Sequence, residues 1–519
     1  MSRRRETVLA ALLGTLAAAV TVLLGDLIAQ LVAPGSSPLF AVGAWVIDIV
    51  PAWVKETAIA LFGTGDKVAL LLCLVLLVLV LAVIAGVLEY RRPPWGVVML
   101  VAVGIVAGGA AVTRAGANVN WALPTAIGVA AGAIVLRLTT ERLHRWVRAV
   151  TDQTPRADTV YAATSRRTFI RAVTGTAVGA VVVGAAGRAM SAATSAANTV
   201  REAIALPKPA VAAPRIPAGA ELAIEGLAPI ITSNESFYRI DVALQVPNID
   251  PTKWKLVIDG EVENEIEINY EQLLALPMVE SATTIMCVSN EVGGGLIGNA
   301  VWLGYPVREL LARAKPKPGA DMVLSTSWDG WTASSPLDVL LEKDRACLLA
   351  VAMNGDPLPL EHGFPVRMIV PGLYGYVSAT KWLTRLTLTR FADDFAYWTQ
   401  RGWSERGPVK TSSRIDVPRT GNQLPTGTVP IAGVAWAQHT GIEGVEVRID
   451  GGAWEPATLA EAISADTWVQ WVYQWDATPG SHIIECRATD AAGGEQSGER
   501  VPVIPNGAEG YHAVSVSVS

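Results

Sequence analysis

The 21 residues from Val68 to Leu88 carry no charged side chain, and this run constrains the fold more than any other feature of the chain. A helix of that length and composition can cross the roughly 30 Å hydrocarbon core of a bilayer. Apolar residues make up 51% of the 519 residues and charged residues 17%, and the imbalance is concentrated in the first third. We therefore expect an N-terminal transmembrane helical bundle followed by water-soluble domains.

Three further runs in residues 1–150 qualify as spans: Thr7–Gly25, Trp95–Thr113 and Ala115–Leu136. The last contains Pro124, which a bundle tolerates because neighbouring helices satisfy the freed backbone groups. The shorter run Phe40–Val54 is typical of an interfacial segment. About four spans are therefore expected in this region.

Basic residues mark the cytoplasmic ends of spans. They cluster at the N-terminus, after the second span and after the fourth, in Arg3-Arg4-Arg5, in Arg91-Arg92, and in Arg137, Arg142, Arg145 and Arg148. The intervening loops contain only three basic residues, Lys55, Lys67 and Arg114. This pattern predicts a cytoplasmic N-terminus. No span contains a histidine, since His144 is expected in a cytoplasmic loop, so a haem held by paired histidines is not expected.

Residues 151–190 contain Ser165-Arg166-Arg167-Thr168-Phe169-Ile170, followed by the mildly apolar run Ala172–Gly187. The segment resembles a twin-arginine export signal. It is equally consistent with two cytoplasmic arginines before a fifth span, and the sequence leaves both interpretations open. Both place the rest of the chain outside the cytoplasmic membrane.

The soluble part divides by composition into three segments. Residues 191–218 are rich in Ala, Pro and Ser and predict a semi-rigid linker. Residues 219–400 mix strand patterns, such as Trp254–Gly260, with helices and lack a regular βαβ repeat, which favours an α+β domain. Residues 401–510 contain short alternating strands between turns, typical of an immunoglobulin-like β-sandwich.

Charge and cysteine content exclude several functions. A net charge of −6 argues against a nucleic-acid partner. The four cysteines form no CxxC motif, which argues against a zinc knuckle or a c-type haem. Cys73, Cys347 and Cys486 lie in apolar segments and are expected to be buried free thiols.

Cys287 differs because it belongs to a group of motifs. It lies in Thr284–Asn290, and the other motifs are Gly298–Gly304, His362–Arg367 and Val370–Gly375. Together, and in this order, they resemble the molybdenum-binding domain of the sulfite oxidase family, over roughly residues 225–505. The resemblance implies that the Cys287 thiolate binds molybdenum and that a molybdopterin dithiolene supplies the other sulfurs. Soft thiolate ligation suits such a metal.

The resemblance also assigns the cofactor-binding residues. His362 and Arg367 match positions that hold the pterin and its phosphate, and an Arg fork suits a phosphate. Ser378 and Lys381 lie in a second cofactor-binding turn, where this chain carries one extra residue.

The opening segment of the domain contains Asn234, Tyr238 and Arg239, which are expected to reach the cofactor or the substrate. Sulfite oxidases have Arg-Asn-His here, whereas in this chain Ile240 and Asp241 follow Arg239. The alternative interpretation is a strand-start aromatic and a surface arginine. Met353-Asn354-Gly355 also matches the family, but we interpret it as a tight turn.

The chain departs from sulfite oxidases where those enzymes hold their dianion with arginines. Val292 occupies one such position, and the segment Trp436–Ile442 contains no arginine where the family has another. Each lost charged hydrogen bond costs about 1.5–3 kcal/mol. Sulfite is therefore disfavoured, and Tyr374, Tyr376 and Trp302 are expected to shape a less charged pocket that suits a sulfoxide.

These patterns predict a membrane-anchored molybdenum oxidoreductase that moves an oxygen atom to or from a small substrate, with Cys287, Arg239 and Tyr376 as its catalytic residues. The chain has no haem domain, so a separate electron-transfer partner is expected. The resemblance leaves a homodimer open. One alternative is a transporter with a fused binding domain, although the spans lack buried charges. Another is a non-catalytic membrane scaffold, although Cys287, His362 and Arg367 are intact.

Overall fold

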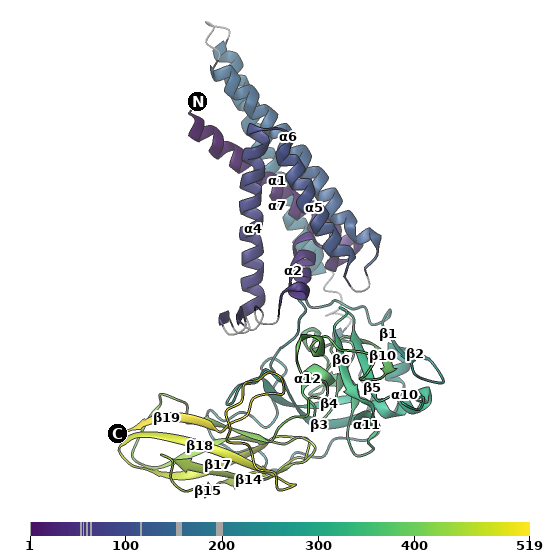
Figure 1. Ribbon diagram of the computed structural model, residues 1–519, viewed down its shortest axis with the longest axis vertical. Helices are drawn as coiled ribbons and strands as arrows, with labels where there is room; N and C mark the ends of the chain where they lie inside the picture. Colours follow the sequence, from purple (N-terminus) through teal and green to yellow (C-terminus); the bar gives the residue numbers. More distant parts are fainter. Residues whose placement is uncertain are drawn as a thin grey trace. The chain divides into compact units, whose positions relative to one another are not determined.

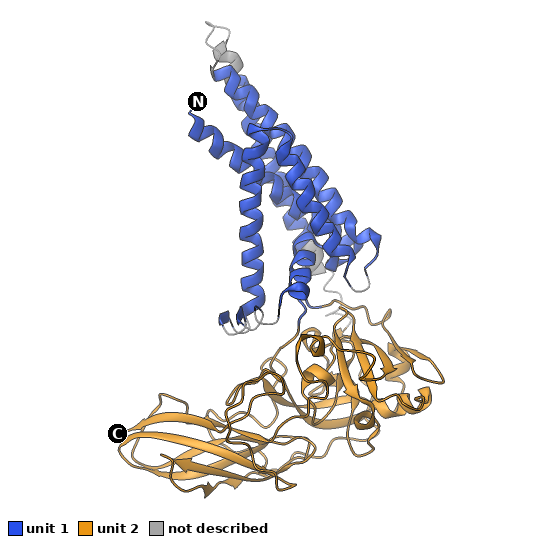
Figure 2. Cartoon of the chain, in the orientation of Figure 1, with its two compact units in different colours: residues 1–196, 242–246 blue, residues 197–241, 247–519 orange. Residues whose placement is uncertain are grey.

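The computed structural model describes the chain except residues 1, 52–53, 55–56, 59–60, 63–64, 115–116, 152–157 and 194–200. It divides into two compact units, residues 1–196 with 242–246 and residues 197–241 with 247–519 (Figure 2). Lys55 and Ala115, which entered the topology prediction, lie outside the described residues.

The first unit is helical (Figure 1). Its elements are Arg3–Val32 (α1), Pro34–Ser36 (η1), Pro38–Ile49 (α2), Asp66–Arg91 (α4), Trp95–Val112 (α5), Val119–Ala122 (η3), Leu123–Thr151 (α6) and Asp158–Ala193 (α7). Five helical stretches are long and apolar enough to cross a membrane: Arg3–Val32, Asp66–Arg91, Trp95–Val112, Val119–Val150 and Thr164–Arg188. Helix α2, which overlaps the predicted interfacial segment Phe40–Val54, is shorter.

Small residues allow α1 to approach its neighbours closely. A Cβ atom on Gly14 would lie 1.9 Å from the Ala82 carbonyl oxygen of α4, and one on Gly128 of α6 would lie 2.3 Å from the Thr21 carbonyl oxygen. Close backbone approach through small residues is the usual way in which apolar helices pack.

Three details of this unit differ from the sequence predictions. Pro124 lies in the first turn of α6, where its missing N–H costs no helical hydrogen bond. His144 lies on α6 and not in a loop, and its ring stacks on Tyr90 with centroids 4.4 Å apart. Cys73 is exposed on α4, so the prediction of a buried thiol was wrong there, whereas Cys347 and Cys486 are buried.

The second unit begins with two sheets. One has the order β2-β1-β10-β5-β6 and the other β3-β4-β7-β8, with β9 paired to β7. The strands are Lys255–Gly260 (β1), Ile266–Asn269 (β2), Val279–Met286 (β3), Ile297–Pro306 (β4), Met322–Ser327 (β5), Thr332–Pro336 (β6), Leu348–Met353 (β7), Asp356–Pro357 (β8), Arg367–Ile369 (β9) and Leu383–Thr389 (β10).

Short helices connect these strands: Tyr270–Leu274 (α9), Val307–Ala314 (α10), Leu337–Leu341 (α11), Leu360–His362 (η4), Gly375–Ser378 (α12) and Thr399–Arg401 (η5). Helix α9 begins where the sequence predicts a helix start, with a capping box between Asn269 and Gln272. The Ala/Pro-rich segment lies extended along β3, since the Glu280 N–H donates to the Val211 carbonyl at 2.8 Å.

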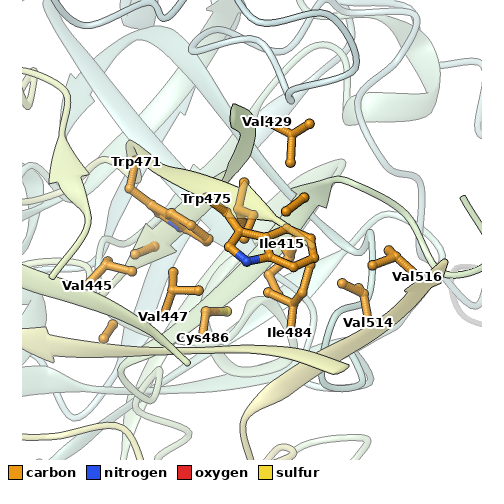
Figure 3. Packing of buried hydrophobic residues seen from close by; sticks show 14 of the residues in the cluster. Ile415, Val429, Val445, Val447, Trp471, Trp475, Ile484, Cys486, Val514 and Val516 are labelled. Atoms are coloured by element: carbon orange, nitrogen blue, oxygen red, sulfur yellow. The ribbon is translucent and has the colours of Figure 1, made fainter. Parts of the chain in front are cut away.

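Two further sheets follow, with the orders β11-β13-β17-β16 and β12-β19-β18-β14-β15. Their strands are Ser412–Val417 (β11), Gln423–Leu424 (β12), Gly427–Trp436 (β13), Ile442–Ile449 (β14), Glu455–Pro456 (β15), Thr458–Leu459 (β16), Val469–Ala477 (β17), Gly480–Asp490 (β18) and His512–Val518 (β19). The two sheets share one core, in which Trp471 and Trp475 of β17 pack with Val447 and Ile484 of the other sheet (Figure 3).

Candidate functional site

Cys287 follows directly after strand β3, at the start of the loop that joins β3 to β4. The last pair of the ladder is Met286 with Ile297, and the Cys287 N–H donates to the Leu296 carbonyl at 2.9 Å. Asn290 closes the loop, because its N–H donates to the Cys287 carbonyl at 3.1 Å and its Oδ1 accepts from the Leu296 N–H at 2.7 Å. The thiol is therefore held at a fixed, buried position.

The electrostatic surroundings of this thiol act in two directions. Burial raises the pKa of Cys287, whereas hydrogen bonds from the N–H and hydroxyl of Ser289 and the charge of Lys381 lower it. The groups that lower the pKa favour the thiolate, which is the form that binds a metal.

His362 and Arg367 are both buried, with 3% exposure each. Gly363 makes the turn between them at φ 111°, and a Cβ atom there would lie 3.0 Å from the Arg367 Cβ. The Arg367 guanidinium donates to the His362 carbonyl at 3.2 Å. It also lies 5.1 Å from the ring centroid of Trp302, so Trp302 supports the arginine from the core and does not line a pocket as predicted.

The His362 and Arg367 side chains differ in charge at neutral pH. Burial, then the charges of Arg367 and Lys381, lowers the pKa of His362 to about 4. Burial lowers the pKa of Arg367 to about 10, which leaves it charged at neutral pH. The site therefore combines a neutral imidazole with a buried guanidinium.

Asn234 supports this pair from the opening segment. Its carbonyl lies 3.0 Å from His362 Nε2, and its side-chain amide donates to the Met353 carbonyl at 3.2 Å. Asn354 donates to the Asn234 side-chain oxygen at 2.9 Å. The predicted tight turn at Asn354 is confirmed, with φ 53° there and 85° at Gly355, and the Asn354 side chain also fixes the opening segment.

Lys381 contacts the segment that carries His362, since its Nζ donates to the Glu361 carbonyl at 2.9 Å. Burial raises the pKa of Tyr238, and the charges of Cys287 and Arg367 act on it in opposite directions, which places these three groups within electrostatic reach of one another. Lys381 Nζ donates to Asp241 Oδ2 at 3.1 Å, and Arg239 Nε donates to the same oxygen at 3.0 Å. Asp241 was not among the predicted site residues.

The hydroxyl groups of Ser378 and Tyr376 already donate to backbone carbonyls. Ser378 Oγ contacts the Tyr374 carbonyl at 2.9 Å, and the Tyr376 hydroxyl donates to the Ser404 carbonyl at 2.6 Å. Burial raises the pKa of Tyr376, so its phenol stays protonated. These two residues lie in α12, and their roles as cofactor-binding and catalytic residues stay predictions.

The two places where the resemblance to sulfite oxidases implies arginines, Val292 and the segment Trp436–Ile442, contain none in this chain. Val292 is half-buried in the loop after Cys287. Gln438 is buried, and its amide donates to the Thr284 carbonyl at 3.4 Å. His439 beside it lies 3.1 Å from Asp466, so its ring contacts an acidic group.

The site contains polar atoms that protein partners do not satisfy. Among the described residues, His362 Nδ1, Arg367 Nε and Asn290 Nδ2 are buried without a hydrogen-bond partner. Such groups cost about 1–3 kcal/mol each unless a ligand or water pairs with them. Arg367 Nε and Asn290 Nδ2 are donors, whereas His362 Nδ1 is an acceptor, because the neutral ring uses its Nε2–H on the Asn234 carbonyl. Together with the buried thiol, these groups fit a ligand that brings a thiophilic metal and rings with both donor and acceptor atoms.

Comparisons with known proteins agree with this fit. The signature of the oxidoreductase molybdopterin binding domain matches residues 243–398. The mitochondrial sulfite oxidase of Macaca fascicularis is 29% identical over 310 residues, covering 50% of this chain and 56% of that enzyme. The uncharacterized oxidoreductase YuiH of Bacillus subtilis is 37% identical over 166 residues, covering 32% of this chain and 80% of that protein.

Among solved structures, the sulfane dehydrogenase SoxCD from Paracoccus pantotrophus matches with 23% identity and a TM-score of 0.48, covering 57% of this chain and 85% of that one. The chain spans about half the length of the sulfite oxidases that it matches. The motifs around Cys287 and the YuiH match, which extends over most of that protein, lead to one assignment. The chain belongs to the sulfite oxidase family of molybdenum-dependent oxidoreductases, whose cofactor is molybdenum-molybdopterin.

Proposed function

We propose that the protein transfers an oxygen atom to or from a small, uncharged substrate and that sulfite is not this substrate. The observation that carries the proposal is the lack of an arginine at Val292, five residues after Cys287, and in the segment Trp436–Ile442. A dianion that loses two charged hydrogen bonds binds more weakly by about 3–6 kcal/mol, at about 1.5–3 kcal/mol each. A sulfoxide does not need these charges.

The cations that do lie in this region are engaged by the protein. Arg367 donates to two carbonyls, and Lys381 and Arg239 share the Asp241 carboxylate. Fixed cations of this kind suit a resident phosphate better than a substrate that must leave after each turnover. We assign Arg367 and Lys381, with His362, to the pterin and its phosphate.

The remaining predicted residues complete the assignment. Cys287 binds the metal, and Asn234, Tyr238 and Ser378 line the cofactor. When bound, the cofactor supplies the two-electron exchange of an oxygen atom with the substrate. Tyr376 binds and orients the substrate, and its phenol keeps its proton. Arg239, which the sequence predicts for both the substrate and the cofactor, is assigned to the cofactor because it shares the Asp241 carboxylate with Lys381. Reduction of a sulfoxide consumes two protons and two electrons and yields a sulfide and water, so a separate electron-transfer partner is required.

We also propose that the five apolar helices anchor the enzyme in the cytoplasmic membrane. The distribution of basic residues favours a cytoplasmic N-terminus and a catalytic domain at the outer face. The arginine pair Arg166-Arg167 lies on α7, as either a twin-arginine signal or the start of a fifth span. The two C-terminal sheets support an immunoglobulin-like domain, which with β19 extends to Val518 and thus beyond the predicted end at residue 510. We propose that a homodimer forms through this domain.

Molybdenum and pterin content test the assignment of the metal ligand. The wild-type protein is expected to contain about one molybdenum per chain, and Cys287→Ala is expected to lose metal or to change its spectrum. Cys347→Ala is the matched control, because this thiol is also buried but lies 3.6 Å from the Val339 carbonyl in a different part of the domain. Equal metal content and identical spectra in all three proteins would exclude Cys287 as the ligand.

Turnover assays test the substrate class. We expect turnover with sulfoxides and little with sulfite. The double variant Val292→Arg with Gln438→Arg should strengthen sulfite binding, measured as a lower KM. High sulfite turnover by the wild-type protein with none for sulfoxides would contradict the proposal.

A further inference from the structure

Asp241 joins two cations of the cofactor region. Its Oδ2 accepts from Arg239 Nε at 3.0 Å and from Lys381 Nζ at 3.1 Å, although 140 residues separate Asp241 from Lys381. The Asp241 side chain is 6% exposed. A buried carboxylate that accepts from two cations fixes the direction of both side chains.

The two cations keep donors for another ligand. Lys381 uses one N–H on Asp241 and one on the Glu361 carbonyl at 2.9 Å, and an ammonium group has three. Arg239 uses its Nε, and within the described residues no hydrogen bond joins its two terminal nitrogens to an acceptor. Arg239 is thus held at one point and Lys381 at two, and each keeps N–H groups for which no described residue is the acceptor.

The charges of this cluster suit a dianion. Arg239 and Lys381 pair with Asp241, and the charge of Arg367 also acts on Lys381. Three positive charges and one negative charge leave an excess of two positive charges. A phosphate monoester carries about −1.5 to −2 at neutral pH. The cluster therefore matches one phosphate group.

We propose that Asp241 is a positioning residue that orients Arg239 and Lys381 toward the phosphate of the molybdopterin cofactor. This inference rests on the proposed assignment of Lys381 to the cofactor. Asp241 is one of the residues at which the chain departs from the Arg-Asn-His of sulfite oxidases, and orienting the two cations gives Asp241 a role.

The Asp241 carboxylate also repels a bound phosphate. Whether Asp241 strengthens or weakens phosphate binding therefore depends on how far the carboxylate and the two cations lie from the phosphate. The carboxylate touches the cations on one side, and the phosphate would contact them on another, so each cation lies closer to the phosphate than the carboxylate does. Without Asp241, the nearly buried Lys381 ammonium would keep one carbonyl acceptor, and the exposed Arg239 would lose its anchor. Orientation therefore outweighs repulsion.

The experiment measures how fast purified holoenzyme variants release molybdopterin, by the fluorescence of the released, oxidised pterin. Asp241→Asn keeps the shape of the side chain and removes its charge. We expect release to be faster by roughly tenfold to a hundredfold, the range of a lost charge-assisted hydrogen bond. Asp259→Asn is the matched control, because Asp259 of β1 also pairs with an arginine, Arg385 of β10, and accepts from Thr387 at 2.8 Å.

A double-mutant cycle with Lys381→Met separates positioning from general destabilisation. If Asp241 acts through Lys381, Asp241→Asn raises the release rate by a smaller factor in Lys381→Met than in the wild-type protein, and it adds less than threefold once Arg239→Met is also present. Full additivity, or release of Asp241→Asn at the wild-type rate, would overturn the inference. If Asp241→Asn does not fold, Asp241→Glu decides, because faster release supports positioning and unchanged release opposes it. A wild-type protein without molybdenum and pterin would overturn the proposed function itself.

Discussion

Replacing Asn354 tests whether the tight turn after β7 holds the cofactor region together. The Asn354 side chain accepts from the Val301 N–H and donates to the Thr232 carbonyl and to the Asn234 side-chain oxygen, each at 2.9 Å. Its backbone has φ 53°, a left-handed conformation that Asn tolerates better than Ala. Asn354→Ala removes the three bonds and adds backbone strain.

The cost follows from these contacts. Three hydrogen bonds at about 0.5–1.5 kcal/mol each contribute about 1.5–4.5 kcal/mol. Left-handed backbone costs Ala about 1–2 kcal/mol. We expect Asn354→Ala to be destabilised by about 3–6 kcal/mol, whereas Asn354→Gly avoids the strain and should lose about 1–2 kcal/mol less.

Thermal unfolding of the full-length protein, followed by tryptophan fluorescence, measures the effect. Asn422→Ala is the control, because Asn422 accepts from the Arg419 N–H at 2.8 Å in an exposed turn of the C-terminal region. Since Asn234 in turn contacts His362, Asn354→Ala should also release molybdopterin faster. A Tm no lower than that of the control, with pterin release at the wild-type rate, would refute this reasoning.

Two further predictions concern the loop after Cys287. Gly293→Ala should destabilise the protein and reduce its molybdenum content, because Gly293 has φ 79° and a Cβ atom there would lie 2.3 Å from the His512 ring. Gly295→Ala is the control, since a Cβ atom at Gly295 would have no neighbour within 4 Å. Tm and metal analysis measure both effects. Burial, and next the charge of Arg414, lowers the pKa of His512 to about 4. The stabilisation of the folded protein by the neutral His512 ring is therefore complete above the ordinary histidine pKa of 6.5 and is lost as pH falls toward 4. The loss should reach about 2–3 kcal/mol, and His512→Gln should reduce this pH dependence in unfolding experiments between pH 4 and 7.

Alternating strands and local turn chemistry were predictable because they depend on neighbouring residues. The strand pattern at Trp254–Gly260 corresponds to β1, and the short alternating strands expected in residues 401–510 correspond to the strands from β11 to β18. The turn at Asn354-Gly355 follows from the conformational freedom of these two residue types.

The contacts that organise the candidate site were not predictable from local sequence. The pairing of Asp241 with Lys381 joins segments 140 residues apart, and the sequence pattern shows only that Asp241 departs from the family motif. Trp302 was expected at a pocket, but it is fully buried and supports Arg367 from the core. The hydrogen bond of Tyr376 to Ser404 likewise depends on a chain segment that follows the motif.

The C-terminal sheets also act on the site, because they hold the strand that carries Cys287. The Thr284 N–H donates to the Asp466 carbonyl at 2.9 Å, and the Thr284 hydroxyl accepts from the Trp468 N–H at 2.8 Å. Arg414 donates to the Gly294 carbonyl at 2.8 Å in the loop after the thiol. A residue in the C-terminal sheets can therefore change the position of Cys287 without contacting the cofactor. For this reason, variants of Arg414 or Trp468 should be judged by molybdenum content as well as by stability.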